Sequence, residues 1–129
     1  MGTHWVATQR SGRLGITDRP RGGDWMVDEV LAWKAIGVDL VVSLLTPEEV
    51  LEFGLEAEED RCYSHGIRFR LFPVSDRGTP SSREAFLEFA ADLSRAVGRG
   101  ETVAIHCRQG VGRSALVAAS VLVLLGEEP

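Results

Sequence analysis

The sequence is poor in cysteine and has no long apolar segment. Its 129 residues contain only two cysteines, Cys62 and Cys107, which are too few for a disulfide framework and indicate a reducing compartment. The longest apolar run, residues 115–125, is interrupted by Ser120 and is too short to span a bilayer. Residues 1–12 lack the apolar core of a signal peptide. These absences predict a cytoplasmic protein.

Positive charge is also scarce. The 14 Lys and Arg residues stand against 19 Asp and Glu residues, and the net charge is −5. That balance argues against general binding to nucleic acid or to an anionic membrane. An anionic substrate must therefore be captured by a local positive site. All but one of the 14 basic residues are arginine, and the planar guanidinium of arginine can bind two phosphate oxygens at once.

The sequence does contain an alternation of strand-like and helix-like segments. Short buried or alternating runs predict strands at residues 4–7, 14–17, 38–45, 67–74 and 102–106. Longer capped segments predict helices at about 24–36, from 47, at about 55–64, from about 82 to 97, and from 113 onward. The pattern indicates a single α/β domain over residues 1–129, with a central, mostly parallel sheet of about four to five strands flanked by helices.

Three of these helices begin with capping signals. Asp24 is expected to cap the first helix through its side chain. Thr46 is followed three residues later by Glu49, which is the spacing of a capping box. Ser81 and Glu84 have the same spacing. The signals predict where the chain leaves a loop and enters a helix.

Residues 107–112 connect the last predicted strand to the last predicted helix. In parallel α/β sheets, ligands bind at the carboxyl ends of the strands, so the site is expected in this connection. Gly110 and Gly112 allow the backbone to approach a ligand closely, and successive N–H groups can form a nest for an anion. The following helix adds its positive end. These features predict a phosphate site.

The side chains around this loop suit phosphate chemistry. Cys107 is expected to ionise at neutral pH, because it lies at a helix N-terminus beside cations, and to act as the nucleophile. Arg113 is expected to clamp the phosphate, Ser114 to donate to the thiolate or help it leave, and His106 to orient the loop by hydrogen bonding. Substrate binding is assigned to Arg108, Gln109, Gly110, Val111 and Gly112, together with Arg113.

A second Cys-x5-Arg sequence shows that the spacing alone is not specific. Cys62 and Arg68 are also six positions apart, in a predicted helix-to-strand connection. That connection contains only Gly66 as a glycine and no helix start follows it. Cys62 is therefore interpreted as a buried helix residue.

Phosphoryl transfer also requires an acid that protonates the leaving oxygen. Asp76 lies in a polar loop that follows the predicted strand 67–74. Alone, Asp-Arg-Gly is typical of a turn. Because the Cys107 loop accompanies it, we interpret Asp76 as the general acid.

His-Cys-x5-Arg-Ser after a strand, with Asp-Arg-Gly-x-Pro about 30 residues upstream, resembles the dual-specificity branch of the cysteine-dependent protein tyrosine phosphatases. It is most similar to the cyclin-dependent-kinase-associated phosphatase group and its bacterial relatives. The resemblance implies a phosphocysteine intermediate on Cys107, phosphate binding by Arg113, Asp76 as acid and then base, and Ser114 as the hydroxyl that helps the thiolate leave. It implies phosphoproteins as substrates, with phosphotyrosine first, and leaves open whether phosphoserine and phosphothreonine are also substrates.

The chain departs from this family at two places. Relatives usually carry proline where this chain has Ser75, so the loop before Asp76 is expected to be less rigid. Family members continue with further helices, whereas this sequence ends at Pro129. The helix over residues 115–125 is apolar on nearly every face, so we expect part of it to be uncovered and to support self-association.

Other phosphate-related functions stay open. A folded loop with a misplaced Asp76 would give a catalytically weak module that binds phosphorylated protein. A small phosphate ester or a phosphoinositide is another substrate class, which Arg108 favours and the apolar Val111 does not. Sulfur transfer and arsenate reduction also use Cys-x5-Arg loops, but neither accounts for Asp76.

A zinc site is a further alternative. Cys62 and His65, together with His106 and Cys107, offer two sulfur and two nitrogen ligands. Adjacent ligands at 106 and 107 have awkward geometry, and the nearby arginines would repel a cation. We therefore expect no metal and no cofactor.

Overall fold

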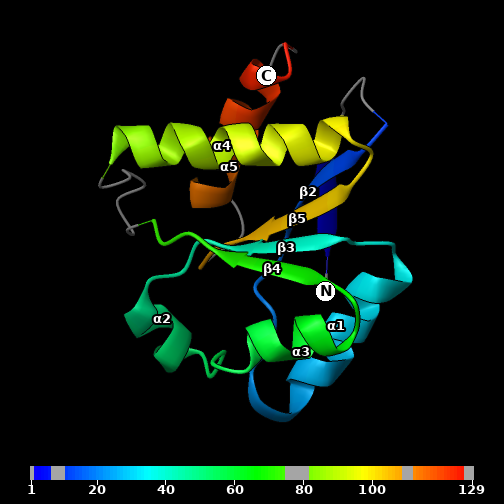
Figure 1. Cartoon of the computed structure of the whole chain (residues 1–129). Coiled ribbons are helices and arrows are strands. Elements are labelled where there is room, and N and C mark those ends of the chain that lie inside the picture. Colours follow the sequence, from blue (N-terminus) through cyan, green and yellow to red (C-terminus); the bar gives the residue numbers. More distant parts are fainter. Residues whose placement is uncertain (1, 7–10, 75–81, 109–111, 127–129) are drawn as a thin grey trace.

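The computed structural model describes residues 2–6, 11–74, 82–108 and 112–126 (Figure 1). Five strands form one sheet in the order β1-β2-β5-β3-β4. Their bounds are Thr3–Val6 (β1), Arg13–Thr17 (β2), Leu40–Ser43 (β3), Arg68–Leu71 (β4) and Thr102–His106 (β5). β1 is antiparallel to β2, and the other neighbouring strands are parallel. The predicted α/β fold with a mostly parallel sheet is confirmed.

The helices lie on both faces of this sheet. Their bounds are Gly23–Trp25 (a 3-10 helix), Met26–Ala35 (α1), Pro47–Glu52 (α2), Glu58–Ser64 (α3), Arg83–Gly98 (α4) and Gly112–Leu124 (α5). Figure 1 shows α4 and α5 on one side of the sheet and α1, α2 and α3 on the other. The predicted segments 38–45, 67–74 and 55–64 are each shorter in the structure, because their ends form turns and loops.

β3 and β5 form the centre of the core, since every residue of both strands is buried. Side chains alternate between the two faces of a strand. Val103 and Ile105 accordingly belong to the cluster packed with α4 and α5, whereas Ala104 belongs to the cluster packed with α1 and α3. Cys107 continues the first series. His106 continues the second, and its ring stacks on Trp33 of α1.

The capping box at the start of α2 is confirmed. The Thr46 hydroxyl accepts from the Glu49 backbone N–H at 3.3 Å, and the Glu49 carboxylate accepts from the Thr46 backbone N–H at 3.0 Å. Thr46 itself has the extended backbone of an N-cap residue. This reciprocal pair fixes both the first turn of α2 and the position of the Glu49 carboxylate.

The other two capping predictions are wrong in detail. Asp24 lies inside the 3-10 helix that precedes α1, and the N-cap residue of α1 is Trp25, which makes no side-chain capping bond. α4 is capped by Ser82, whose hydroxyl accepts from Ala85 N–H at 3.2 Å. The cap is one residue later than the predicted Ser81, which lies outside the described residues. Adjacent serines give the sequence no way to choose between them.

α5 buries one face and leaves apolar side chains on another. Its buried residues include Val117 and Val121, whereas Leu116, Val123 and Leu124 are 38%, 59% and 48% exposed. The expected uncovered apolar surface is therefore present, and self-association across it stays a prediction. Across the described ranges, no helix combines the length and the apolar character needed to cross a membrane.

Candidate active site

Three parallel strands end together at one edge of the sheet. The register pairs Ser43, the last residue of β3, with His106 at the end of β5 and with Leu71 at the end of β4. Backbone bonding continues past the strands, because Leu44 N–H donates to His106 C=O at 3.0 Å and Val74 N–H donates to Leu44 C=O at 3.0 Å. The segments that leave these strands are thus held side by side.

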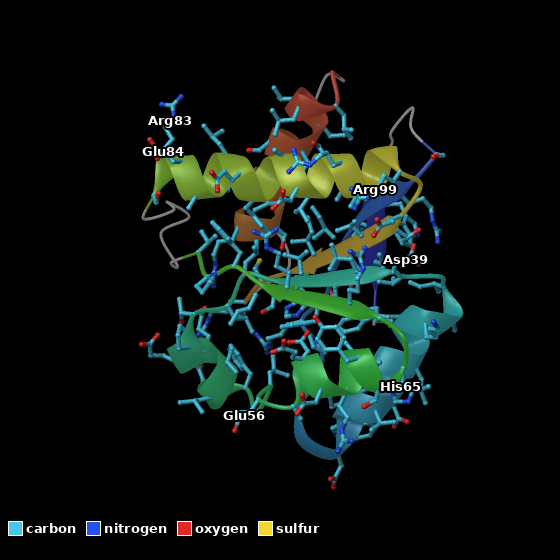
Figure 2. All side chains as sticks on the ribbon, in the orientation of Figure 1. Asp39, Glu56, His65, Arg83, Glu84 and Arg99 are labelled. Atoms are coloured by element: carbon cyan, nitrogen blue, oxygen red, sulfur yellow. The ribbon has the colours of Figure 1, made fainter. Side chains whose placement is uncertain are left out.

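The views of the whole molecule place this edge relative to the helices. α2 lies at the carboxyl end of β3 and β4 (Figure 1). Figure 2 shows Arg83 and Glu84, the start of α4, at that same end, whereas Asp39 and Arg99 lie at the opposite end. The predicted site around Cys107 and Arg113 therefore lies at the end of the sheet where α2 and the start of α4 also lie.

Cys107 is the first residue after β5, and its side chain is 2% exposed. Neither Cys107 nor Cys62 forms a disulfide. Ser114, in the first turn of α5, is fully buried, and its hydroxyl has no hydrogen-bond partner among the described residues. The predicted bond from Ser114 to Cys107 is therefore not seen in the structure, and the role of Ser114 stays a prediction.

Arg113 also lies in the first turn of α5 and is 4% exposed. Its Nη1 and Nη2 donate to the two carboxylate oxygens of Glu49 at 2.8 and 2.9 Å. Nη1 donates in addition to Val74 C=O at 2.6 Å. These contacts come from α2 and from the segment after β4, so the guanidinium is fixed at the edge where the strands end.

Glu49 is the counterion that offsets the desolvation cost of the buried Arg113 guanidinium. An unpaired guanidinium in the interior would carry a desolvation cost of several kcal/mol. The hydrogen bonds from Arg113 lower the pKa of the Glu49 carboxyl to about 2, against the opposing effect of its burial. Glu49 is therefore ionised throughout the physiological range, and its charge offsets that of Arg113.

A second guanidinium, that of Arg108, lies at the rim of the predicted site, directly after Cys107 in the sequence. Arg108 pairs with Glu52 through two bonds of 3.0 and 3.2 Å, and its side chain is 35% exposed. Arg19, from the segment after β2, donates to Arg108 C=O at 2.5 Å. Both guanidinium groups lie over the ring of Phe53, at 3.6 Å for Arg19 and 5.1 Å for Arg108. The rim therefore carries two cations and an aromatic ring beside the predicted nucleophile.

His106 is fully buried on the opposite face of β5 from Cys107. Its Nε2 lies 2.6 Å from Oε2 of Glu58, the first residue of α3. The ring stacks on Trp33, with centroids 6.1 Å apart and planes at 14°. The predicted hydrogen bonding by His106 is therefore directed at α3, and Nδ1 has no partner among the described residues.

Several predicted site residues cannot be placed. Gln109, Gly110 and Val111 of the loop and the predicted acid Asp76 lie outside the described residues, as does Ser75. Gly112 is the first residue of α5. The assignments made for these residues stay predictions, and so do the catalytic roles of Cys107 and Arg113.

Three residues near the site were not predicted from sequence. Glu49 was noted only as part of a capping box, although a capping carboxylate is a fixed charge that a buried arginine can use. Glu58 and Arg19 carried no signal, because their partners are 48 and 89 positions away in the sequence. Within the described ranges, no group of three or more His, Cys, Asp or Glu side chains could hold a metal ion.

Comparison with known proteins adds a family. The family described as "Tc-R-P: Polymorphic toxin system, DSP-PTPase phosphatase" matches residues 17–127. Cyclin-dependent kinase inhibitor 3 of Rattus norvegicus is 30% identical over 94 residues, which cover 73% of this chain and 44% of the rat protein. The chain spans less than half the length of the curated relatives that it matches.

Solved structures share the fold. Kinase-associated phosphatase (KAP), crystallised with its catalytic-site cysteine replaced by serine, superposes with a TM-score of 0.86 at 23% identity, over 96% of this chain and 74% of that one. TpbA of P. aeruginosa, crystallised in complex with phosphotyrosine, gives a TM-score of 0.55 at 18% identity, over 87% of this chain and 60% of that one.

Proposed function

Since this chain belongs to the DSP-PTPase phosphatase family, within the cysteine-dependent protein tyrosine and dual-specificity phosphatases, we propose that it hydrolyses phosphate monoesters on proteins through a phosphocysteine intermediate on Cys107. One observation carries the proposal. Cys107 and Arg113 are both buried at the ends of a β5–α5 connection, where the strands end, and Glu49 fixes the guanidinium with bonds of 2.8 and 2.9 Å.

In the first step, the Cys107 thiolate attacks phosphorus, the S–P bond forms, and the bond to the leaving oxygen breaks. Asp76 gives its proton to that oxygen. Arg113 and the N-terminus of α5 neutralise the charge on the three non-bridging oxygens. Because the guanidinium is already fixed by Glu49 and Val74 C=O, little reorganisation is needed when the phosphate arrives.

In the second step, water attacks the phosphocysteine and Asp76 takes its proton. The S–P bond breaks, and the electron pair returns to Cys107 as a thiolate. We assign to the Ser114 hydroxyl the role of donating to this thiolate as it forms; in the structure the hydroxyl is buried in the first turn of α5 and bonds no described residue, Cys107 included. The reaction needs no metal.

Phosphotyrosine is the substrate that we propose first, with phosphoserine and phosphothreonine as further candidates. Support comes from TpbA, a protein of the same fold that has been crystallised with phosphotyrosine. Arg19, whose guanidinium lies over the Phe53 ring and bonds Arg108 C=O, supplies positive charge beside the site for a peptide around the phosphorylated side chain.

Trapping of the phosphocysteine intermediate tests the proposed function. The protein is mixed with an aryl phosphate, quenched in acid, digested, and examined by mass spectrometry for a phosphate adduct. We expect the adduct on the peptide that contains Cys107, and release of the phenol in an initial burst. Turnover without an adduct on Cys107, or binding of phosphopeptides without turnover, contradicts the proposal, and the second outcome identifies a binding module instead.

The acid is tested through the leaving group. Asp76→Asn should slow release of alkyl and phenyl leaving groups of high pKa by about 100-fold, and release of nitrophenol-type leaving groups much less, because only the former need a proton. An equal effect on both series would remove Asp76 from the role of acid.

A further inference from the structure

The buried pair of Glu58 and His106 lies outside the proposed chemistry. Both side chains are inaccessible to solvent, at 2% and 0% exposure, and Oε2 and Nε2 are 2.6 Å apart. A carboxyl group this deeply buried is rare unless it is paired. The short distance is typical of a charge-assisted hydrogen bond. The hydrogen-bonding partner of the Glu58 carboxyl is thus the imidazole of His106, the residue directly before the proposed nucleophile Cys107.

The surroundings of the imidazole leave it little freedom. One face of the His106 ring stacks on Trp33, and the indole Nε1 of Trp33 donates to Thr17 Oγ1 at 3.4 Å. The His106 C=O accepts from Leu44 N–H. Backbone, ring face and Nε2 are thus each held by a different part of the chain, namely the residue directly after β3, α1 and α3.

Cys62, one turn further along α3, is a buried titratable neighbour of Glu58. Its burial, together with the charges of Glu58 and Glu59, raises the pKa of its thiol to about 12, so it stays neutral in the working range. Ser43, paired with His106 across β3 and β5, is uncharged and buried. Among the described residues, Glu58 is accordingly the acidic group that bonds the imidazole.

A carboxylate that accepts from Nε2 determines which ring nitrogen carries the proton. With the proton on Nε2, the buried Nδ1 is the acceptor of the neutral ring, and it bonds no described residue. If the carboxylate is replaced by an amide, the amide can donate to Nε2 instead and place the proton on Nδ1. The protonation of the ring and the direction of its hydrogen bond to α3 then change together.

We propose that Glu58 is a positioning residue for the nucleophile: through its bond to Nε2 it fixes the tautomer and orientation of His106, and thereby the backbone position in which Cys107 is held as a thiolate at the N-terminus of α5. This inference rests on the proposed function, because it assigns Cys107 as the nucleophile. It can nevertheless be tested without measuring phosphatase activity. Loss of the bond loosens the alignment of Cys107 with the positive end of the helix, and the thiolate becomes less favourable.

The reactivity of Cys107 toward iodoacetamide as a function of pH tests this inference without any phosphatase assay. Glu58→Gln should move the midpoint of alkylation upward by about one pH unit, which slows alkylation below the midpoint by about 10-fold. It should also lower kcat for an aryl phosphate more than it changes KM. Glu59→Gln is the matched control, because Glu59 is the next residue of α3 and is exposed, and we expect the profile of the unmodified protein.

A double-mutant cycle separates positioning from a general packing effect. In a His106→Asn background, Glu58→Gln should cause no further shift of the midpoint, because the partner through which it acts is gone. Where Glu58→Gln does not fold, Glu58→Asp keeps the charge on a shorter side chain and should give a smaller shift in the same direction.

An unchanged midpoint in a folded Glu58 variant overturns the inference, and so does a shift of equal size in the His106→Asn background. The two proposals fail separately. A shifted midpoint in a protein that turns over no phosphate would contradict the proposed function and leave the role of Glu58 standing.

Discussion

The chain contains two Cys-x5-Arg sequences, and the structure gives them opposite surroundings. Cys62 lies in the middle of α3, fully buried, and burial raises the pKa of its thiol to about 12. Arg68 begins β4, has a side chain 52% exposed, and pairs with Glu101. Cys107 instead follows the last residue of a strand, and Arg113 is 4% exposed in the first turn of a helix.

The order of the elements makes the difference. In a helix-to-strand connection the arginine is at the amino end of the strand, away from the edge where parallel strands bind ligands. Figure 2 shows Arg99, which shares Glu101 with Arg68, at the end of the molecule opposite the start of α4. In a strand-to-helix connection, both residues reach the ligand-binding edge. A cysteine and an arginine six positions apart can therefore act together at the ligand-binding edge when the connection runs from strand to helix, as it does for Cys107 and Arg113.

Exchange of each sulfur for oxygen gives the largest contrast. Cys107→Ser should lower kcat for an aryl phosphate by at least about 10,000-fold, because the nucleophile is lost. Cys62→Ser should leave kcat within about twofold, since Cys62 lies within α3 and takes no part in the proposed chemistry. Steady-state assays on both folded variants decide the matter. Equal losses would mean that the two sequences are not functionally distinct.

Alkylation of the native protein gives the next contrast. Both cysteines are buried, but at pH 7 the thiol of Cys62, with a pKa of about 12, is almost entirely protonated. Cys107 should therefore react with iodoacetamide at least about 1,000-fold faster. Peptide mapping by mass spectrometry measures both rates in one sample. Inorganic phosphate should protect Cys107 and leave Cys62 unaffected, and the contrast should disappear in denaturant.

The two arginines should differ by a smaller factor. Arg113→Lys should lower kcat/KM by several hundredfold, because an ammonium cannot hold the fork geometry on phosphate and on Glu49 together. Arg68→Lys replaces a side chain that is half exposed and should change kcat/KM by less than about twofold. A loss in Arg68→Lys that matched the loss in Arg113→Lys would contradict this view.

The counterions give the smallest contrast, in stability. The pKa of Glu49 is lowered from 4.5 to about 2 by its bonds to Arg113, so the folded state favours the ionised form. This contribution is present above about pH 4.5 and is lost as the pH falls toward 2, and it amounts to about 3 kcal/mol.

Denaturant unfolding at pH 7 and pH 3 measures that contribution. Glu49→Gln should lower the free energy of unfolding at pH 7 by about 3 kcal/mol and should weaken its dependence on pH below 4.5. Glu101→Gln removes the more exposed pairing with Arg68 and Arg99 and should cost about 1 kcal/mol or less. A similar cost for both would contradict the contrast.

Much of this arrangement follows from the sequence, and for identifiable reasons. β5 was predicted within its observed bounds because a short apolar run lies between a glycine-rich turn and the cysteine loop. The capping box at Thr46 was predicted because both partners are local. The prediction that Asp24 caps α1 was wrong because a 3-10 turn precedes α1, and such a turn has no distinct sequence pattern.

The contacts that hold the site together could not be predicted in the same way. Arg113 meets Glu49 across 64 positions, and His106 meets Glu58 across 48. Each pair depends on which helix packs against which face of the sheet, and local patterns do not carry that information. Glu58 also has the sequence context of a solvent-exposed residue at a helix start, with acidic neighbours, and only the fold buries it.

The double use of Glu49 has a thermodynamic consequence. The carboxylate that accepts from Arg113 also accepts from the Thr46 backbone N–H and so completes the first turn of α2. Where opening of that turn also displaces the guanidinium, the two equilibria are linked, and linkage is reciprocal. An anion that binds Arg113 then changes the free energy of opening at the start of α2, measured by amide hydrogen exchange, by the amount that opening changes its binding. Hydrogen exchange in the six-residue helix α2 would then respond to binding of an anion at Arg113, although α2 does not contain the proposed nucleophile.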